Sequence, residues 1–339
     1  MTYRPSFCDD SSPGYPPIHN ANSHSKLDPT FREQGQIWIA GMATRNRNQV
    51  RPSTLIHWTG ILKNWIYPVI GCIHLSELNN TSIKQLIRQM AEAGLSASTI
   101  RTYVQIVKMV VGSLVDFDGE PIYPRAWNSR FLDIPQIDRH NRNAPRFSVG
   151  IMSGLSSWES PTERVLFILA GATGARVGEL LGLEIDRHIS PDFSTLRIVQ
   201  TLNNRVKSPC AEREIDLHSS VSRLLSAFVG DRTSGLLFCS RTGNPISAST
   251  ALRYHLHPAL KELGFVNPQN MSAQAGFFAF RRFRKAYLFG CDGLPAHLRN
   301  YWMGHSDRSI DLYYGDVEPD RALRKHWAER CGIGFDLYT

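Results

Sequence analysis

The sequence predicts a mainly α-helical protein with one small antiparallel β-sheet, divided into a helical domain and a mixed α+β domain. Apolar residues recur at helical spacing over most of the chain. The period changes to two only between about residues 194 and 217, where apolar and polar residues alternate. A length of 339 residues is enough for two domains of ordinary size, each with its own core.

The composition fits a soluble globular protein, with 42% hydrophobic and 20% charged residues. No apolar run approaches the roughly 20 residues that cross a bilayer, and the N-terminus lacks the apolar segment of a signal peptide. The six cysteines are scattered without a CxxC pair, so we expect no disulfide framework, no metal site and a reducing compartment. These features predict a cytoplasmic protein.

We expect residues 1–35 to form a disordered N-terminal arm, because most of this stretch is rich in Ser, Pro, Asn and Gly and lacks periodicity. A helical domain is predicted over residues 36–118. Its first helix opens at Pro52 and is expected to end at Pro68 and Gly71.

Two further helices follow in this domain. Asn80 or Thr81 could cap the first, which Gly94 ends, and Ser96 or Ser98 could begin the second. The domain is therefore predicted to be a compact bundle of about four helices.

Basic residues outnumber acidic ones in the first predicted domain and in the linker that follows it. Residues 36–146 hold 13 Lys and Arg against 7 Asp and Glu, within a net charge of +8. Such a stretch could follow a phosphate backbone, although an ordinary solvated surface explains the charge equally well. Within it, residues 119–146 are rich in Pro, Asn and charge, and we expect an interdomain linker. Its Arg139, Arg142 and Arg146 could contact phosphates, with a solvated loop as the alternative.

The second domain is expected over residues 147–339, with a C-terminal tail. Helical patterns over residues 148–156 and 160–172 precede the alternating stretch, whose turn is expected near Asn203 and Asn204. The chain is then predicted to be helical again to about residue 331.

Three motifs in this domain carry side chains suited to phosphate chemistry. In ATGARVGELLGL (172–183), Arg176 follows a turn at the start of a helix, and Glu179 lies on the same face three residues later. An arginine held by a carboxylate can present its fork to a phosphate. Taken alone, the pair would more often be an ordinary surface ion pair.

The second motif, FAFRRFRKAYL (278–288), places Arg281, Arg284 and Lys285 on one helix face, which we expect to point outward and to be available to DNA. A solvated basic face is the default explanation for such a helix.

The third motif is WMGHSDRSIDLYYG (302–315). A turn at Gly304 and His305 leads into a short helix that ends in Tyr313 and Tyr314. A single histidine or tyrosine is more often a packing residue than a reactive group.

In this order and at these spacings, the three motifs resemble the tyrosine recombinases, the family of phage integrases and Xer-type enzymes. The resemblance assigns Arg176 and Arg281 as the two phosphate-binding arginines, with Glu179 in support. It assigns His305 to the family's L-G-H motif, with Met303 in place of Leu. Tyr314, nine residues after His305, takes the place of the nucleophile, and Tyr313 stays as the alternative.

Two positions fit the family pattern less well. The resemblance places a catalytic lysine in the β-hairpin, where VKSPCAEREIDL offers Lys207. The family usually has His three residues before the second arginine, and here that position is Phe278, which can neither donate nor accept a proton. A shifted register would read Arg284 as the second arginine and put Arg281 at the histidine position, but it shortens the spacing to His305.

The N-terminal block resembles the SAM-like core-binding domain of the same family, so the resemblance covers nearly all of residues 36–331. It implies a site-specific recombinase, an integrase of a mobile element, that cleaves and rejoins double-stranded DNA through a 3′-phosphotyrosyl intermediate. Neither cofactor, metal nor ATP would be needed, and the protein would act near the nucleoid. Family members work as tetramers on DNA, in some cases with accessory DNA-bending proteins. Residues 317–331 could reach a neighbouring subunit or pack onto their own domain.

Two other functions remain open on the sequence. A type IB topoisomerase would use the same nucleophile and arginines, but the N-terminal block argues against it. A DNA-binding protein that has lost catalysis is the alternative that Phe278 supports.

Overall fold

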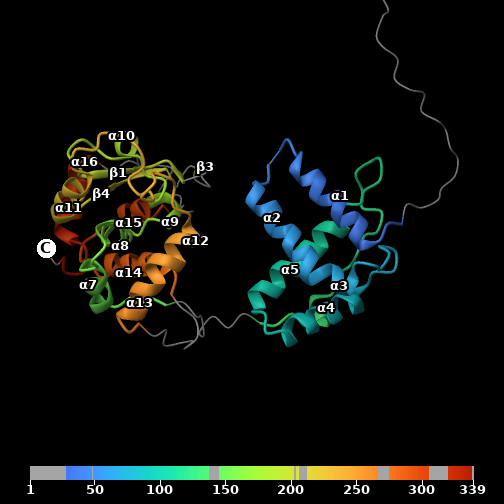
Figure 1. Cartoon of the computed structure of the whole chain (residues 1–339). Helices are drawn as coiled ribbons and strands as arrows, with labels where there is room; N and C mark the ends of the chain where they lie inside the picture. The colour runs from blue at the N-terminus through green and yellow to red at the C-terminus, as the bar shows by residue number, and fades with distance from the viewer. Residues whose placement is uncertain are drawn as a thin grey trace, which may run out of the picture. The chain divides into compact units, whose positions relative to one another are not determined.

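The protein is described here from a computed structural model, which covers residues 28–47, 49–136, 145–201, 204–205, 212–265, 275–304 and 320–337. The chain divides into two compact units, Met1–Arg139 and His140–Thr339 (Figure 1). Each unit has a separate hydrophobic core. Within the described ranges, no helix combines the length and apolarity needed to cross a membrane.

The first unit is helical throughout. Its elements are α1 (Phe31–Ala43), α2 (Pro52–Ile61), the π-helical segment η1 (Leu62–Ile66), α3 (Tyr67–Ile70), α4 (Asn80–Glu92), α5 (Ala97–Val111) and the short α6 (Ser129–Leu132). Side chains from α1, η1, α4 and α5 form the core, as the helical periodicity predicts.

Helix α1 precedes the first predicted helix, which opens at Pro52 as expected and is α2. Thr30 caps α1, accepting a hydrogen bond from the backbone N–H of Glu33, while the Glu33 carboxylate accepts one from the N–H of Thr30. Phe31 is fully buried in the core. The expected disordered arm over residues 1–35 is therefore wrong for residues 31–35.

The helix predicted to open at Pro52 continues through η1 and past Pro68 to Ile70, where Gly71 caps it. Of the two residues expected to end this helix, Gly71 is confirmed and Pro68 is wrong. A proline lacks the N–H donor and its ring crowds the carbonyl four residues earlier, which normally breaks a helix. The wider π turn immediately before Pro68 accommodates both effects. The same device recurs in the second unit, where η3 (Ala251–Leu256) precedes Pro258 in α13 (His257–Glu262).

Part of the expected linker over residues 119–146 belongs to the first unit. Leu132 in α6 is fully buried against α4. Arg125 donates hydrogen bonds to the carbonyls of Leu75 (2.6 Å) and Leu78 (2.9 Å), which fixes this stretch to the bundle. The linker prediction is wrong here because composition does not reveal an arginine that satisfies backbone carbonyls.

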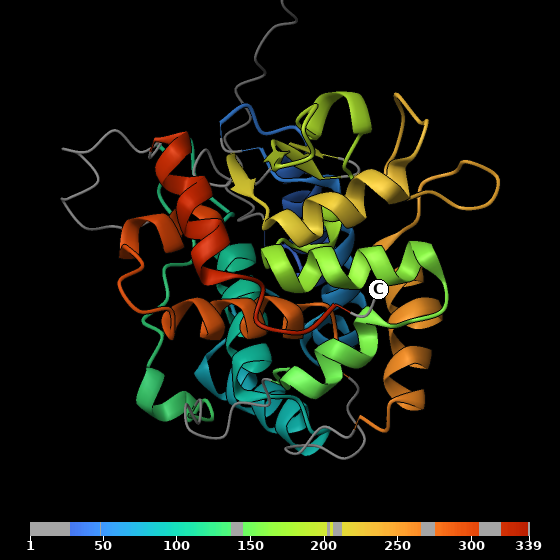
Figure 2. The ribbon, with the colours of Figure 1, turned by 90° about the vertical axis from the view of Figure 1, so that its left-hand side faces the viewer.

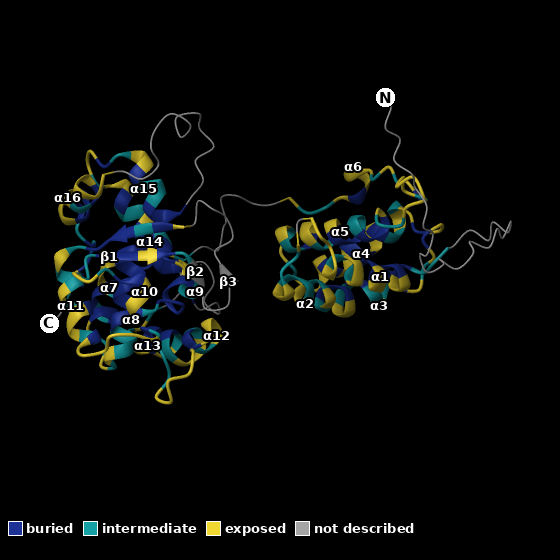
Figure 3. Cartoon of the chain, turned by 90° about the horizontal axis from the view of Figure 1, so that it is seen from above, coloured by how far each residue is buried: buried dark blue, intermediate teal, exposed yellow. Residues whose placement is uncertain are grey.

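The second unit is built around α8. Its helices are α7 (Val149–Ser156), α8 (Pro161–Thr173), α9 (Val177–Leu180), α10 (Ile185–His188), α11 (Ser219–Val229), α12 (Ala248–Thr250), α13, α14 (Phe278–Phe289), α15 (Ala296–Met303) and α16 (Arg321–Cys331). Helix α8 lies between α11 and α14 (Figure 2) and is buried over most of its length (Figure 3).

The sheet is small and antiparallel, which confirms the predicted fold class. Strand β1 (Thr195–Ile198) pairs with β4 (Arg213–Asp216), with Thr195 opposite Asp216 and Ile198 opposite Arg213. Strands β2 (Gln200–Thr201) and β3 (Asn204–Arg205) pair with each other. Helices α15 and α16 pack on β4, so Asp216 and Arg213 are buried as well as Ile215.

Helix α16 packs onto its own domain. Arg324 pairs with Asp216 (Nε–Oδ2, 2.9 Å) and with Glu214 of β4, and Glu329 accepts a hydrogen bond from the N–H of Ser219 (2.7 Å). Of the two alternatives for residues 317–331, the described part thus follows packing in the same subunit.

Candidate active site

Arg176 lies in the turn between α8 and α9. Gly174 ends α8 in the left-handed conformation (φ +64°), and a Cβ there would lie 3.1 Å from Cβ of Arg284, so glycine is required for this close turn. The carboxylate of Glu179 accepts hydrogen bonds from the backbone N–H of Arg176 (2.9 Å) and from its Nη1 (2.7 Å). Glu179 is buried, whereas 44% of the Arg176 side chain is exposed. Arg176 is thus held from beneath and open to a ligand.

Glu179 also receives Arg213 of β4. The Arg213 Nη2 lies 2.9 Å from Oε2 of Glu179, and its Nε donates to the carbonyl of Trp302 at 2.7 Å. The Arg213 side chain is completely buried. Burial acts to raise the pKa of Glu179, but attraction to Arg213 and the hydrogen bonds from both arginines outweigh it and hold the pKa below its usual value. The carboxylate therefore stays charged.

Arg281 enters from α14 and contacts both neighbouring turns. Its Nη1 donates to the carbonyl of Gly174 (2.9 Å), and its Nη2 donates to the carbonyl of Met303. Burial, with repulsion from Arg176 and Arg213, lowers the pKa of Arg281 to about 10. These contacts bring together two arginines that lie more than a hundred residues apart in the sequence.

The end of α15 completes the described part of the site. Gly304 adopts φ +58°, and a Cβ there would lie 3.0 Å from Nη1 of Arg213. Only glycine permits this approach without displacing the guanidinium. Gly304 is the last described residue of this segment, and His305 follows it in the sequence.

We call Arg176, Glu179, Arg213 and Arg281 the arginine cluster. It holds three guanidinium groups and one carboxylate, so its formal charge is positive. Burial lowers the pKa of Arg281, and repulsion from Arg176 and Arg213 lowers it further. A bound phosphate would relieve this repulsion, and two arginines can offer donors to non-bridging oxygens. The geometry suits an anionic ligand next to Arg176.

Arg284 lies apart from the arginine cluster. Arg284 is buried on another side of α14, where its Nη1 donates to the carbonyl of Gly332 (2.8 Å) at the end of α16. The prediction that Arg284 faces outward to contact DNA is therefore wrong, and the shifted register loses its support. Lys285 is exposed, as is Arg146, and their contacts with DNA stay predictions.

Phe278 is 55% exposed at the start of α14, with the Arg282 guanidinium 5.0 Å from its ring centre. It lies one turn before Arg281 in α14.

Five predicted site residues lie outside the described part of the chain: the catalytic Lys207, His305 and Tyr314, and the DNA-binding Arg139 and Arg142. The ambiguity between Tyr313 and Tyr314 lies there too. In the described ranges, no group of three or more His, Cys, Asp and Glu side chains is placed to hold a metal ion.

Arg213 was missed by the sequence analysis. The sequence pattern could have indicated it. In β4, Arg213 lies two residues before the apolar Ile215 and four before Leu217, so its side chain is expected on the same inward face of the strand. An arginine at an inward-facing strand position needs a buried anionic or carbonyl partner.

A sequence profile of the phage integrase family matches residues 151–320, just over half of the chain. The chain therefore belongs to the phage integrase family. By family and fold it is a tyrosine site-specific recombinase, an enzyme that cleaves and rejoins DNA. Among curated proteins, no sequence matches significantly.

Solved integrases share the fold over most of the chain. The integrase of the Tn1549 transposon, in complex with transposon right end DNA, is 17% identical, with a TM-score of 0.64 over 88% of this chain and 98% of that chain. A lambda integrase dimer bound to a COC′ core site is 16% identical, with a TM-score of 0.63 over 89% and 84%. A lambda integrase tetramer bound to a Holliday junction is 15% identical, with a TM-score of 0.60 over 86% and 84%.

Proposed function

We propose that this recombinase acts as an integrase of a mobile element and cleaves double-stranded DNA through a 3′-phosphotyrosyl intermediate. The observation that carries the proposal is the arginine cluster, whose surplus positive charge gathers around the accessible Arg176. A phosphodiester in the middle of its reaction gathers negative charge on its non-bridging oxygens, which such a cluster neutralises without a metal ion.

In the proposed reaction, the phenol oxygen of Tyr314 attacks the scissile phosphorus. The bond from phosphorus to the 5′-oxygen breaks, and Lys207 protonates the leaving oxygen. The phenol proton passes to a nearby base, for which His305 is the candidate. Arg176 and Arg281 hold the two non-bridging oxygens throughout.

The intermediate conserves the energy of the broken bond. A 5′-hydroxyl from another strand can therefore attack the phosphotyrosine and restore a phosphodiester without ATP. We infer a tetramer on DNA, by analogy with the lambda integrase tetramer. Accessory DNA-bending proteins could assist its assembly. Because the substrate is chromosomal or element DNA, we place the protein in the cytoplasm, at the nucleoid.

Arg146 and Lys285 are proposed to contact the DNA backbone, together with Arg139 and Arg142. Arg146 and Lys285 are exposed. Such contacts would hold the duplex in register without reading its sequence.

The decisive experiment uses nicked duplexes that carry the end sequences of the mobile element that encodes this protein. The nick lets the short 5′-hydroxyl strand diffuse away, so the covalent complex accumulates. We expect wild type to form a protein–DNA adduct that survives denaturation, Tyr313→Phe to form it as well, and Tyr314→Phe to form none.

An adduct that persists in Tyr314→Phe but disappears in Tyr313→Phe would show that the neighbouring tyrosine is the nucleophile. Specific binding without any adduct in wild type would contradict the catalytic proposal. Relaxation of plasmids that lack the element ends would instead indicate a topoisomerase.

A further inference from the structure

We propose that Arg213 is a positioning residue that holds Arg176, through Glu179, and the turn before His305 in one fixed arrangement. The inference rests on the proposed function, because it concerns the same phosphate site.

The contacts of Arg213 join three segments that are distant in sequence. Its Nη2 pairs with Oε2 of Glu179 at 2.9 Å, and its Nε donates to the carbonyl of Trp302 at 2.7 Å. The side chain extends from β4, so a single guanidinium links the sheet, the start of α9 and the end of α15.

The first consequence concerns Arg176. Glu179 uses Oε1 for Nη1 of Arg176 and Oε2 for both Arg213 and the N–H of Arg176. A carboxylate clamped at both oxygens cannot rotate, so the fork of Arg176 is aimed in one direction. Without Arg213, Glu179 would keep only its local partner and could turn together with Arg176.

The second consequence concerns the turn that leads to His305. Arg213 holds the carbonyl of Trp302, and Arg281 holds that of the next residue, Met303. Gly304 then passes within 3.0 Å of the Arg213 guanidinium, measured from the position that a Cβ would take. The backbone is thus fixed up to the residue before His305.

Stability alone does not account for an arginine at this place. Arg213 adds a third positive charge to a buried group, and its repulsion contributes to the lowered pKa of Arg281. Buried ion pairs can often be replaced by apolar residues without loss of stability. The cost of repulsion is offset when a phosphate enters, which fits a residue that serves ligand binding.

The test measures single-turnover adduct formation by the full chain on the nicked duplex. Two forms of the duplex are compared, one natural and one with a methylphosphonate at the scissile position. Replacing a non-bridging oxygen by methyl removes the phosphate charge, so the reaction then depends less on a well-aimed Arg176.

We expect Arg213→Met to slow adduct formation on the natural duplex by about 10²-fold, the scale of a small misplacement of reacting groups. On the methylphosphonate the loss should be much smaller, and duplex binding should change little. Arg213→Lys, which keeps the charge but reaches fewer partners, should recover part of the rate.

The matched control is Arg324→Met. Arg324 is an equally buried arginine that pairs with carboxylates of the same strand but does not contact the arginine cluster in any described interaction. Its loss should lower the Tm and slow both duplexes by the same factor, if at all.

The proposal is overturned if Arg213→Met slows both duplexes equally, as the control does, or leaves the natural duplex unaffected. If Arg213→Met does not fold, the ratio of the two rates in Arg213→Lys decides in the same way. Absence of any adduct in wild type would refute the proposed function instead.

Discussion

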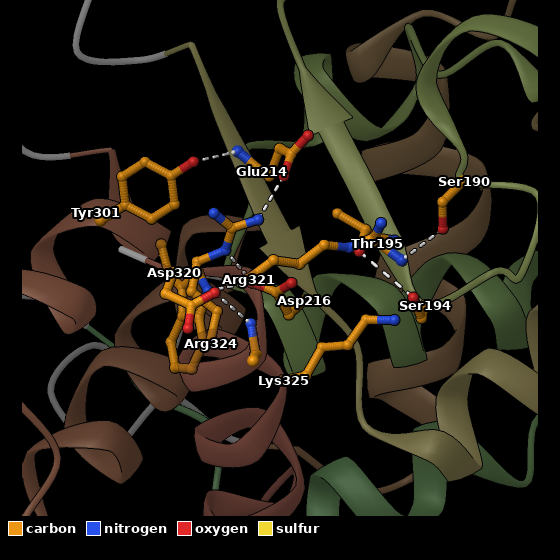
Figure 4. Close-up of polar contacts among 12 residues, drawn as sticks. Ser190, Ser194, Thr195, Glu214, Asp216, Tyr301, Asp320, Arg321, Arg324 and Lys325 are labelled. Atoms are coloured by element: carbon orange, nitrogen blue, oxygen red, sulfur yellow. Dashed lines mark hydrogen bonds and ion pairs between the residues drawn. The ribbon is translucent and has the colours of Figure 1, made fainter. Parts of the chain in front are cut away.

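Strand β4 supports two buried arginine groups that differ in their charge balance. The arginine cluster has three guanidinium groups and one carboxylate, that of Glu179, which pairs with Arg176 and Arg213. In the second group, which we call the α16 anchor, Arg324 alone lies between Glu214 and Asp216 (Figure 4). Trp302 belongs to both, because its carbonyl accepts from Arg213 and its Nε1 donates to Asp216 (3.1 Å).

Burial does not separate the two groups, whereas charge does. Arg281 is 4% exposed and Arg324 is 3% exposed. Burial acts to lower the pKa of both, yet the pKa of Arg324 is raised overall, because Asp216 and Glu214 attract its charge. The pKa of Arg281 falls to about 10, because burial lowers it and repulsion from Arg176 and Arg213 adds to that effect instead of opposing it. In the α16 anchor two carboxylates face one guanidinium, whereas in the arginine cluster one carboxylate serves three guanidinium groups.

The largest effect on stability is expected at the anchor. Arg324→Met leaves the fully buried Asp216 without its cation, which should lower the free energy of unfolding by about 3–5 kcal/mol. Urea unfolding followed by tryptophan fluorescence measures this loss. A loss below about 1 kcal/mol, the range of exposed pairs, would contradict the contrast between the two groups.

The next effect is on the reaction. Arg281→Ala should slow adduct formation by about 10²–10³-fold, or about 3–4 kcal/mol of barrier, because it removes a donor to the phosphate. It should destabilise the free protein less than Arg324→Met does, since the loss also relieves repulsion. Arg282→Ala is the matched control on the same helix, because Arg282 binds the carbonyl of Pro145 and should change the rate little. Equal rate losses in both variants would rule out the role given to Arg281.

The smallest effect is the response to a simple anion. Inorganic phosphate at ten times its Kd should stabilise wild type by about 1.4 kcal/mol, beyond the effect of chloride at equal ionic strength. Arg281→Ala should lose most of this gain, while Arg324→Met should retain it, because guanidinium groups outnumber carboxylates in the arginine cluster but not in the α16 anchor. The measurement is Tm against phosphate concentration. A full gain in Arg281→Ala would mean that phosphate binds elsewhere.

The helical periodicity of most of the chain and the two-residue period between about residues 194 and 217 were sufficient to predict the mainly α fold and its small sheet. It failed where a local interaction overrides a general rule. Pro68 was expected to end a helix, but a π turn carries the chain past it. The packing of α6 was hidden within a stretch whose composition is typical of a linker, because one arginine there binds backbone carbonyls.

The site was predictable to the extent that local motifs define it. Arg176, Glu179 and Arg281 lie together, as the motifs indicated. Arg284 was assigned to the same outward face as Arg281, but it is buried and donates to the carbonyl of Gly332, just after α16, which a helix pattern alone cannot reveal. Arg213 was missed because it belongs to no local motif and acquires its partners only through tertiary packing.

The contacts of Arg281 with Gly174 and Met303 are made to main-chain oxygens. Every residue offers the same carbonyl, so recognition here is indifferent to side-chain identity. Such a contact is compatible with methionine at position 303 as well as with the leucine of the L-G-H pattern. A substitution at position 303 changes the hydrophobic packing of the buried side chain but keeps the hydrogen bond from Arg281 to the backbone carbonyl.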